Sequence, residues 1–115
     1  MQVGILGAGQ LGLMLAESLY ALNHDVAFYA PGSGTPCERR LADVTVAPWD
    51  DVEALGAFFA RCDVVTYEFE HLPVAIAERI AESKPVHPVP RALQVCQNRE
   101  AEKTLFGNLG IPTPQ

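Results

Sequence analysis

The stretch Met1-Gln-Val-Gly-Ile-Leu-Gly-Ala-Gly-Gln-Leu-Gly12 decides the fold class of this chain. Its apolar run, Val3 to Leu6, is typical of a strand buried on both faces, and the glycine-rich segment Gly7 to Gly12 follows where a helical pattern begins. Glycines allow a tight turn, and the free amides at the start of a helix attract an anion. The stretch therefore predicts a strand, a turn and a helix N-terminus that bind a phosphate-bearing ligand. Its spacing is that of the dinucleotide fingerprint, which the rest of the chain has to support.

The composition indicates one soluble globular domain. The chain has 115 residues, of which 49% are hydrophobic and 19% charged. Its net charge is −6 and its longest basic cluster is Arg39-Arg40, which argues against a nucleic-acid partner. No apolar stretch is long enough to cross a bilayer and no signal-peptide pattern precedes the first strand, so we expect no membrane partner and a cytoplasmic location.

The cysteines and histidines indicate neither a disulfide framework nor a metal site. Cys37, Cys62 and Cys96 are odd in number and lack CxxC spacing, so we expect all three to be reduced and to have structural roles. The histidines are scattered without ligand spacing, at His24, His71 and His87. No metal ligand is therefore assigned.

Strand and helix patterns alternate along the chain. We expect strands at residues 3–6, 25–30, 44–47, 63–67 and 84–88, and helices at residues 10–22, 50–62, 73–81 and 98–109. The alternation predicts an α/β, Rossmann-like domain with three layers, a mainly parallel sheet and right-handed crossovers. The preferred strand order is 3-2-1-4-5, which places ligands at the carboxyl ends of the strands, beside the glycine turn.

Apolar spacing and capping signals add detail to the helices. The side chains expected to be buried are Leu11, Met14, Leu15, Ser18, Leu19 and Leu22 in the first helix, Val52, Leu55, Phe59 and Cys62 in the second, Ile76, Ala77, Ile80 and Ala81 in the third, and Ala101, Leu105 and Leu109 in the last. Asp50 with Glu53, and Asn98, are expected N-caps, while Gly110 is expected to end the last helix. We expect Trp49 to be a packing residue and residues 31–36 to form an irregular loop.

Two strand ends bear on the ligand. A dinucleotide site has an acidic residue at the end of its second strand, but Phe28 to Gly32 contains none, so the turn suits a smaller anion. The segment after residue 67 instead presents Glu68 and Glu70, two residues apart. This pair suits the binding of hydroxyl groups, and the alternative is a solvated acidic loop. The predicted strand order places it beside the glycine turn and favours a binding site.

Four separated motifs carry a resemblance to a known family. They are Gly7-Ala-Gly-Gln-Leu-Gly12 with Met14, Cys62-Asp-Val-Val-Thr-Tyr-Glu-Phe-Glu70, Gln97-Asn-Arg99 with Glu102-Lys103, and Leu109-Gly-Ile-Pro-Thr-Pro114. In this order, they resemble the N-terminal part of the 5-(carboxyamino)imidazole ribonucleotide synthetases, ATP-grasp ligases of purine biosynthesis. The resemblance implies a preATP-grasp domain at residues 1–96, and a helix and tail at residues 97–115 that lead into an ATP-grasp domain.

The resemblance also implies a reaction and a set of partners. Members carboxylate 5-aminoimidazole ribonucleotide with bicarbonate and ATP through a carboxyphosphate intermediate. The lysines and the Mg²⁺-binding acids of this reaction belong to later domains, so we expect the 115-residue chain alone to be inactive and to hold no cofactor tightly. The family is often dimeric, which allows a homodimer here.

Site residues are carried over position by position. The resemblance assigns Gly9, Gln10 and Leu11 of the turn to the ribonucleotide substrate, together with Glu68 as a hydrogen-bond acceptor. It assigns Arg99 to ATP, and no catalytic residue lies in the chain. Leu13 departs from the pattern, because the family often has arginine after the last glycine.

Two other interpretations stay open. One is a regulatory or redox module that binds NAD, which the absence of an acid at the second strand disfavours. The other is a fragment of a related ATP-grasp enzyme that acts on glycinamide ribonucleotide, in which the turn tends to carry glutamate at the position of Gln10.

Overall fold

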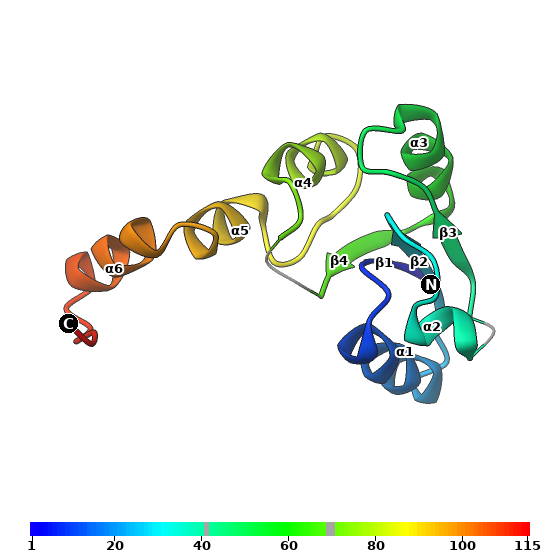
Figure 1. Cartoon of the computed structure of the whole chain (residues 1–115), viewed down its shortest axis with the longest axis horizontal. Coiled ribbons are helices and arrows are strands. Elements are labelled where there is room, and N and C mark those ends of the chain that lie inside the picture. Colours follow the sequence, from blue (N-terminus) through cyan, green and yellow to red (C-terminus); the bar gives the residue numbers. More distant parts are fainter. Residues whose placement is uncertain (41, 69–70) are drawn as a thin grey trace.

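The centre of the molecule is a four-stranded, all-parallel sheet (Figure 1). The computed structural model describes residues 1–40, 42–68 and 71–115. The strands are β1 (Gln2–Leu6), β2 (Asp25–Ala30), β3 (Val44–Val46) and β4 (Val64–Tyr67). Their spatial order is β3-β2-β1-β4, which confirms the α/β class and the predicted order of the first four strands.

The predicted fifth strand is reduced to one isolated bridge. Val86 pairs in parallel with Val65 beside β4, at the predicted edge of the sheet. Val65 donates its N–H to the Pro85 carbonyl at 2.9 Å, and His87 donates to the Val65 carbonyl at 3.0 Å. Because Pro85 and Pro88 have no N–H to donate, the pairing does not extend beyond this point. The prediction of a strand over residues 84–88 was therefore wrong in extent.

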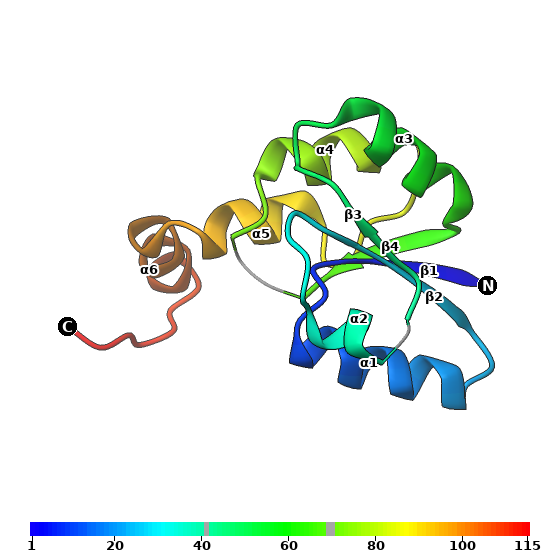
Figure 2. The same cartoon turned by 45° about the vertical axis from the view of Figure 1, so that its right-hand side comes forward.

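Helices cover both faces of the sheet. They are α1 (Gln10–Ala21), α2 (Pro36–Arg39), α3 (Val52–Arg61), α4 (Val74–Ala81), α5 (Pro90–Cys96) and α6 (Arg99–Asn108). Figures 1 and 2 show α1 and α2 on one face, α3 and α4 on the other, and α6 apart from the sheet beyond α5. Among the described residues, no helix is long and apolar enough to span a bilayer.

Two of these helices were not predicted. Helix α2 begins at Pro36, and its N-cap Thr35 forms a capping box with Glu38. The Thr35 hydroxyl accepts from the Glu38 N–H at 3.3 Å, and the Thr35 N–H donates to the Glu38 carboxylate at 2.8 Å. Helix α5 also begins with a proline, Pro90, in its first turn. Both starts carry the proline signal typical of a helix N-terminus.

The predicted buried face of the first helix was wrong. Leu11, Met14 and Leu22 are exposed, with relative accessibilities of 66%, 54% and 67%. The residues that face the sheet are Gly12, Leu13 and Ala16. Gly12 and Ala16 are about one turn apart, and because glycine has no side chain and alanine has only a methyl group, the helix can approach the sheet closely. Helix α1 therefore packs on the sheet through the face that carries its small residues, and not through its leucine stripe.

Leu13 belongs to this buried face. It packs in the core between α1 and the sheet, where Phe28 and Val26 also lie. Of the predicted stripe, Leu19 is partly buried against the same cluster. The departure from the family pattern at position 13 thus places an apolar side chain in the core.

Helix α3 differs from its prediction at two positions. Its N-cap is Asp51 rather than Asp50, and the Asp51 carboxylate accepts from the Ala54 N–H at 2.9 Å. Val52 is exposed, whereas Phe58 is buried against β1 and β2. Leu55, Phe59 and Cys62 are buried, as predicted.

The last two predicted helices were partly correct. In α4, Ala77 and Ile80 are buried, but Ala81 is exposed. Helix α6 contains no buried residue, which contradicts its predicted buried face. Ala101 and Leu105 are half-buried and Leu109 is exposed. The Asn98 cap and the left-handed Gly110, with φ of +71°, are confirmed.

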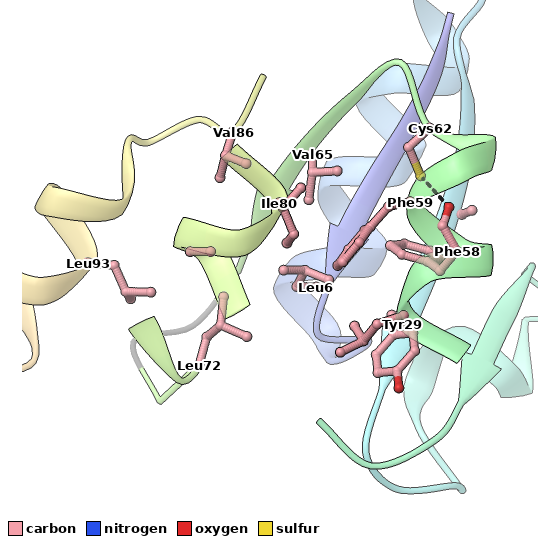
Figure 3. Packing of buried hydrophobic residues seen from close by; sticks show 13 residues of the cluster. Leu6, Tyr29, Phe58, Phe59, Cys62, Val65, Leu72, Ile80, Val86 and Leu93 are labelled. Atoms are coloured by element: carbon pink, nitrogen blue, oxygen red, sulfur yellow. Dashed lines mark hydrogen bonds between the residues drawn. The ribbon is translucent and has the colours of Figure 1, made fainter. Parts of the chain in front are cut away.

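Two apolar clusters lie on opposite faces of the sheet. The larger cluster packs α3, α4 and α5 on the sheet, and Figure 3 shows its central residues. Within it, the rings of Tyr29 and Phe58 are 5.5 Å apart. Trp49 packs against this cluster and stacks on Tyr29 at 5.4 Å, which confirms its predicted packing role. The smaller cluster lies beneath α1 and α2.

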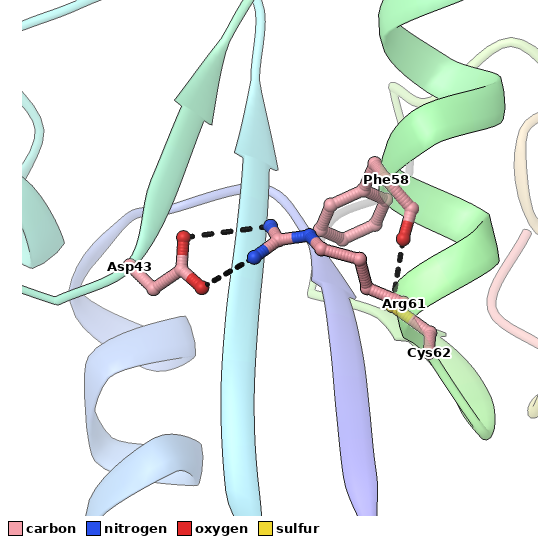
Figure 4. Close-up of polar contacts among 4 residues, drawn as sticks. All are labelled: Asp43, Phe58, Arg61 and Cys62. Carbon is pink, nitrogen blue, oxygen red and sulfur yellow. Dashed lines mark hydrogen bonds and ion pairs between the residues drawn. The ribbon is translucent and has the colours of Figure 1, made fainter.

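An ion pair ties α3 to the edge of the sheet (Figure 4). The Arg61 guanidinium donates to both oxygens of Asp43, at 2.8 and 3.4 Å, and lies 6.0 Å from the centre of the Phe58 ring. The hydrogen bond to Asp43 raises the pKa of Arg61. Because both side chains are about half exposed, at 46% and 49%, we expect the pair to contribute at most about 1 kcal/mol.

Candidate functional site

The glycine turn joins β1 to α1 at the carboxyl edge of the sheet. Gly7 has φ of +102°, a backbone conformation that favours glycine, and donates its N–H to the Tyr29 carbonyl at 2.8 Å. Gly9 is the N-cap of α1 and has no side chain to cap the helix. The first turn also has no acidic residue. Any anion that caps α1 must therefore come from elsewhere.

That anion is the carboxylate of Glu68. Oε1 accepts from the Gly9 N–H at 2.9 Å, and Oε2 accepts from the Gly12 N–H at 2.5 Å. Glu68 directly follows β4, and its own N–H donates to the Leu6 carbonyl at 3.2 Å. Since β1 and β4 are neighbours in the sheet, the strand order brings turn and carboxylate together. The two segments therefore lie next to each other, as the predicted strand order requires, and the Glu68 carboxylate occupies the Gly9 and Gly12 amides.

Both glycines are needed for this approach. A Cβ atom at position 9 would lie 2.8 Å from Glu68 Oε1, and one at position 12 would lie 3.0 Å from Oε2. These distances are too short for ordinary contact, so a side chain at either position would displace the carboxylate. The glycine spacing is thus explained by Glu68.

Two amides of the turn remain available. In the described part of the chain, no acceptor faces the N–H groups of Gln10 and Leu11, and both residues are exposed. A carboxylate offers about four lone-pair positions, of which the amides of Gly9 and Gly12 use two. The site can therefore donate through Gln10 and Leu11 and accept through Glu68. The predicted substrate residues of the turn and Glu68 lie together.

Cys37 forms hydrogen bonds with the backbone of the glycine turn. Its thiol donates to the Gly9 carbonyl at 3.7 Å, and its N–H donates to the Ala8 carbonyl at 3.4 Å. Burial, and then the charge of Glu68, raise the pKa of Cys37 to about 11. The group is a thiol at neutral pH and a packing residue, as predicted. Its contact with the turn could not be seen in the sequence.

The other cysteines differ in exposure. Cys62 is buried in the larger cluster, where burial raises its pKa and its thiol contacts the Phe58 carbonyl at 3.3 Å. Cys96 is exposed at the end of α5. All three cysteines are free.

Arg99 lies in a different place. It is the first residue of α6, is exposed, and lines a pocket of about 510 Å³ with His71, Leu72, Pro73, Cys96, Gln97 and Glu102. Leu72 and Gln97 are joined there by a hydrogen bond from the Gln97 side-chain amide to the Leu72 carbonyl. The pocket shares no residue with the turn at Gly9 to Gly12. The structure therefore does not bring Arg99 to Glu68.

The remaining predictions for the site concern a second acid and metals. Glu70, expected beside Glu68, lies outside the described residues. Within residues 1–40, 42–68 and 71–115, no group of three or more histidine, cysteine or acidic side chains could hold a metal ion. No metal ligand is assigned.

The fold and the site define a class of protein. The chain has a parallel sheet, a glycine turn and a carboxylate at the end of the neighbouring strand, which is the arrangement of α/β domains that bind small ligands at the carboxyl edge of the sheet. The chain belongs to the ribonucleotide synthetase preATP-grasp domain family, whose model matches residues 1–97.

Relatives and solved structures agree with this membership. The N5-carboxyaminoimidazole ribonucleotide synthase of Brucella melitensis is 40% identical over 96% of this chain. The crystal structure of N5-carboxyaminoimidazole ribonucleotide synthetase from Thermus thermophilus is 42% identical over 97% of the chain, with a TM-score of 0.91. The Aspergillus clavatus synthase in complex with ADP and 5-aminoimidazole ribonucleotide is 32% identical over 99%, with a TM-score of 0.85. The chain spans 31% of the length of each.

Proposed function

We propose that this chain is the N-terminal, substrate-binding part of an ATP-dependent ligase that carboxylates 5-aminoimidazole ribonucleotide in de novo purine biosynthesis. The names of the relatives support the activity, and the Aspergillus clavatus complex with ADP and 5-aminoimidazole ribonucleotide supports the ligands. The observation on this chain that carries the proposal is the Glu68 carboxylate held against the glycine turn at the carboxyl edge of the sheet.

The chain's own residues bind and orient the ligands. Glu68 accepts a hydrogen bond from the ribonucleotide, while Gln10 and Leu11 donate their free N–H groups to its oxygens. Gly9 contributes through Glu68, because its N–H holds the carboxylate and its lack of a side chain leaves room for it. The Arg99 guanidinium is permanently charged, and no carboxylate among the described residues pairs with it, so its charge suits an ATP phosphate.

The proposed chemistry uses ATP and bicarbonate. Bicarbonate attacks the terminal phosphate of ATP and releases ADP, and the ribonucleotide amine then attacks the carboxyphosphate carbon and releases phosphate. Within the described residues, no group of three or more histidine, cysteine or acidic side chains could hold a metal ion, and no step of this chain is assigned to Mg²⁺. The chain alone is not expected to turn over. The proposal includes a cytoplasmic location, which suits three free cysteines, and allows a homodimer.

A chimeric enzyme tests the proposal. This chain would replace the segment that it matches in the Brucella melitensis synthase, to which it is 40% identical. We expect ADP formation that requires both 5-aminoimidazole ribonucleotide and bicarbonate, and none from the 115-residue chain alone. A folded chimera that binds ATP but shows no ribonucleotide-dependent ADP formation would contradict the proposal.

The same chimera separates the other interpretations. Glycinamide ribonucleotide in place of 5-aminoimidazole ribonucleotide should give no ADP formation, and a preference for it would assign the chain to the related enzyme. Calorimetry of the 115-residue chain with NAD should show no binding, because Glu68 holds the amides that a pyrophosphate would need. Micromolar affinity for NAD would favour the dinucleotide interpretation.

A further inference from the structure

We propose that Gly9 and Gly12 are positioning residues, whose amides orient the Glu68 carboxylate to receive an N–H or O–H donor of the substrate rather than a phosphate. The identity of the substrate rests on the proposed function above. The juxtaposition of the two amides with both carboxylate oxygens rests on the structure alone.

The carboxylate is fixed at both oxygens. Its two donors belong to one rigid segment, because the first turn of α1 is closed by the Leu13 N–H on the Gly9 carbonyl at 3.0 Å. The Gly9 carbonyl is held in turn by the buried thiol of Cys37. A side chain with several rotatable bonds is thereby limited to one orientation. Its unused lone pairs then have fixed directions toward a ligand.

The charge of Glu68 decides the chemistry of that ligand. A helix N-terminus attracts an anion, and Glu68 already supplies one to α1. A phosphate beside Glu68 would meet a like charge, whereas an amine or a hydroxyl would meet an acceptor. We therefore expect the amine or the ribose hydroxyls of the ribonucleotide to face Glu68, with the phosphate farther away.

Alanine substitutions at the two glycines displace the carboxylate without removing it. In Gly12→Ala the new Cβ would lie 3.0 Å from Glu68 Oε2 and 3.3 Å from Phe28 Cε1. In Gly9→Ala it would lie 2.8 Å from Oε1, and the backbone φ of −80° at this position is open to alanine. Gly56→Ala and Gly107→Ala are matched controls, because a Cβ at either position meets no atom within 4 Å.

Steady-state kinetics of the chimera measure the positioning effect. Gly12→Ala and Gly9→Ala should raise KM for 5-aminoimidazole ribonucleotide by about 10- to 100-fold and leave KM for ATP unchanged. The control at Gly56 should change neither constant. A purely structural role would lower thermal stability but leave the KM of the folded enzyme as it was. An unchanged KM in both glycine variants would overturn the proposal.

A second measurement does not depend on activity. In ¹⁵N NMR spectra of the 115-residue chain, Glu68→Gln should shift the Gly9 and Gly12 amide signals together, because both N–H groups donate to the Glu68 carboxylate. Gly9 and Gly12 amide signals that Glu68→Gln leaves unchanged would overturn the positioning role. If the unsubstituted chimera is inactive while both amide signals respond to Glu68→Gln, the proposed function fails and the positioning geometry stands.

Inorganic phosphate tests the chemistry of the ligand. In the unsubstituted chain, phosphate should leave the Gly9 and Gly12 amide signals unchanged, because Glu68 holds both groups. In Glu68→Ala the freed amides should shift on addition of phosphate, and Glu68→Gln is the second variant if the first does not fold. Phosphate that displaces Glu68 from the unsubstituted turn would overturn the assignment of a donor group to this position.

Discussion

The body and the arm of this molecule hold their candidate groups in different ways. We call residues 1–96 the body and residues 97–115, with α6, the arm. In the body, Glu68 is fixed by two backbone amides above a buried core. In the arm, α6 has no buried residue and Arg99 is exposed. The fold of the body therefore fixes the Glu68 carboxylate, whereas the Arg99 side chain of the arm lies exposed.

This difference suggests a division of work within the proposed enzyme. The proposed substrate recognition by Glu68 would use a position set by the parallel sheet, because the strand order brings the end of β4 to the glycine turn. The proposed contact of Arg99 with ATP would instead use an exposed side chain on α6, which contains no buried residue. The domain boundary at residue 96 stays a prediction, and stability measurements can separate the two regions.

The largest expected effect is the loss of a buried ring from the body. Phe58 is buried between α3 and the sheet, where it contacts Tyr29 and Phe59. Phe58→Ala should lower the free energy of unfolding by about 3–5 kcal/mol, because it removes apolar burial and leaves a cavity. Urea unfolding followed by circular dichroism measures the change.

The matched substitution in the arm is Phe106→Ala. Phe106 is half-buried on α6, so its removal should cost less than about 1 kcal/mol in the same experiment. Equal costs for Phe58→Ala and Phe106→Ala would break the distinction between body and arm.

A smaller effect is expected from an added methyl group in the body. A Cβ at Gly4 of β1 would lie 2.6 Å from Cys62 Sγ and 3.2 Å from Phe58 Cζ. Gly4→Ala should therefore destabilise the chain by about 1–3 kcal/mol through overpacking. Thermal and urea unfolding would both report it, and Gly107→Ala on the arm is the control, since its Cβ meets no atom within 4 Å.

A double substitution identifies the cause. If the clash with Cys62 is responsible, the double variant Gly4→Ala/Cys62→Ala should lose less unfolding free energy than the two single variants lose together. Strictly additive losses would show that the clash with Cys62 Sγ is not the cause of the destabilisation.

The sequence was sufficient for the sheet but not for the helix faces. Buried apolar runs such as Ile5-Leu6 and alternating helices predicted the class and the order of the first four strands, because parallel strands buried on both faces have few other arrangements. The leucine stripe of α1 predicted the wrong buried face. Helix α1 instead packs on the sheet through Gly12 and Ala16, whose small size allows a close approach. Periodicity reports an apolar face, and only the packing distance shows which face is used.

The site was predictable in its members but not in its contacts. Gly9 and Glu68 were both identified from local patterns, and the strand order predicted that they face the same crevice. Their direct hydrogen bond could not be foreseen, because it depends on a side-chain orientation across 59 residues of chain. The capping box of Thr35 and Glu38 was not predicted, although its spacing is visible in the sequence.

The smallest expected effect compares the caps of two helices. Asp51 caps α3 in the body through the Ala54 N–H, and Asn98 caps α6 in the arm through the N–H groups of Glu100 and Ala101. Asp51→Ala should lower the free energy of unfolding by about 1 kcal/mol, because α3 is packed on the core. Asp50→Ala, one residue earlier, should have almost no effect.

Asn98→Ala removes a cap of similar geometry from a helix that buries no residue. Its cost should be confined to α6, with faster amide hydrogen exchange in the first turn of that helix and an unchanged midpoint of global unfolding. Helix α6 would unfold together with the body if Asn98→Ala lowered the global midpoint as much as Asp51→Ala does. In that case the arm would share the cooperative unit of the sheet, and the orientation of Arg99 would be set by the same fold that fixes Glu68.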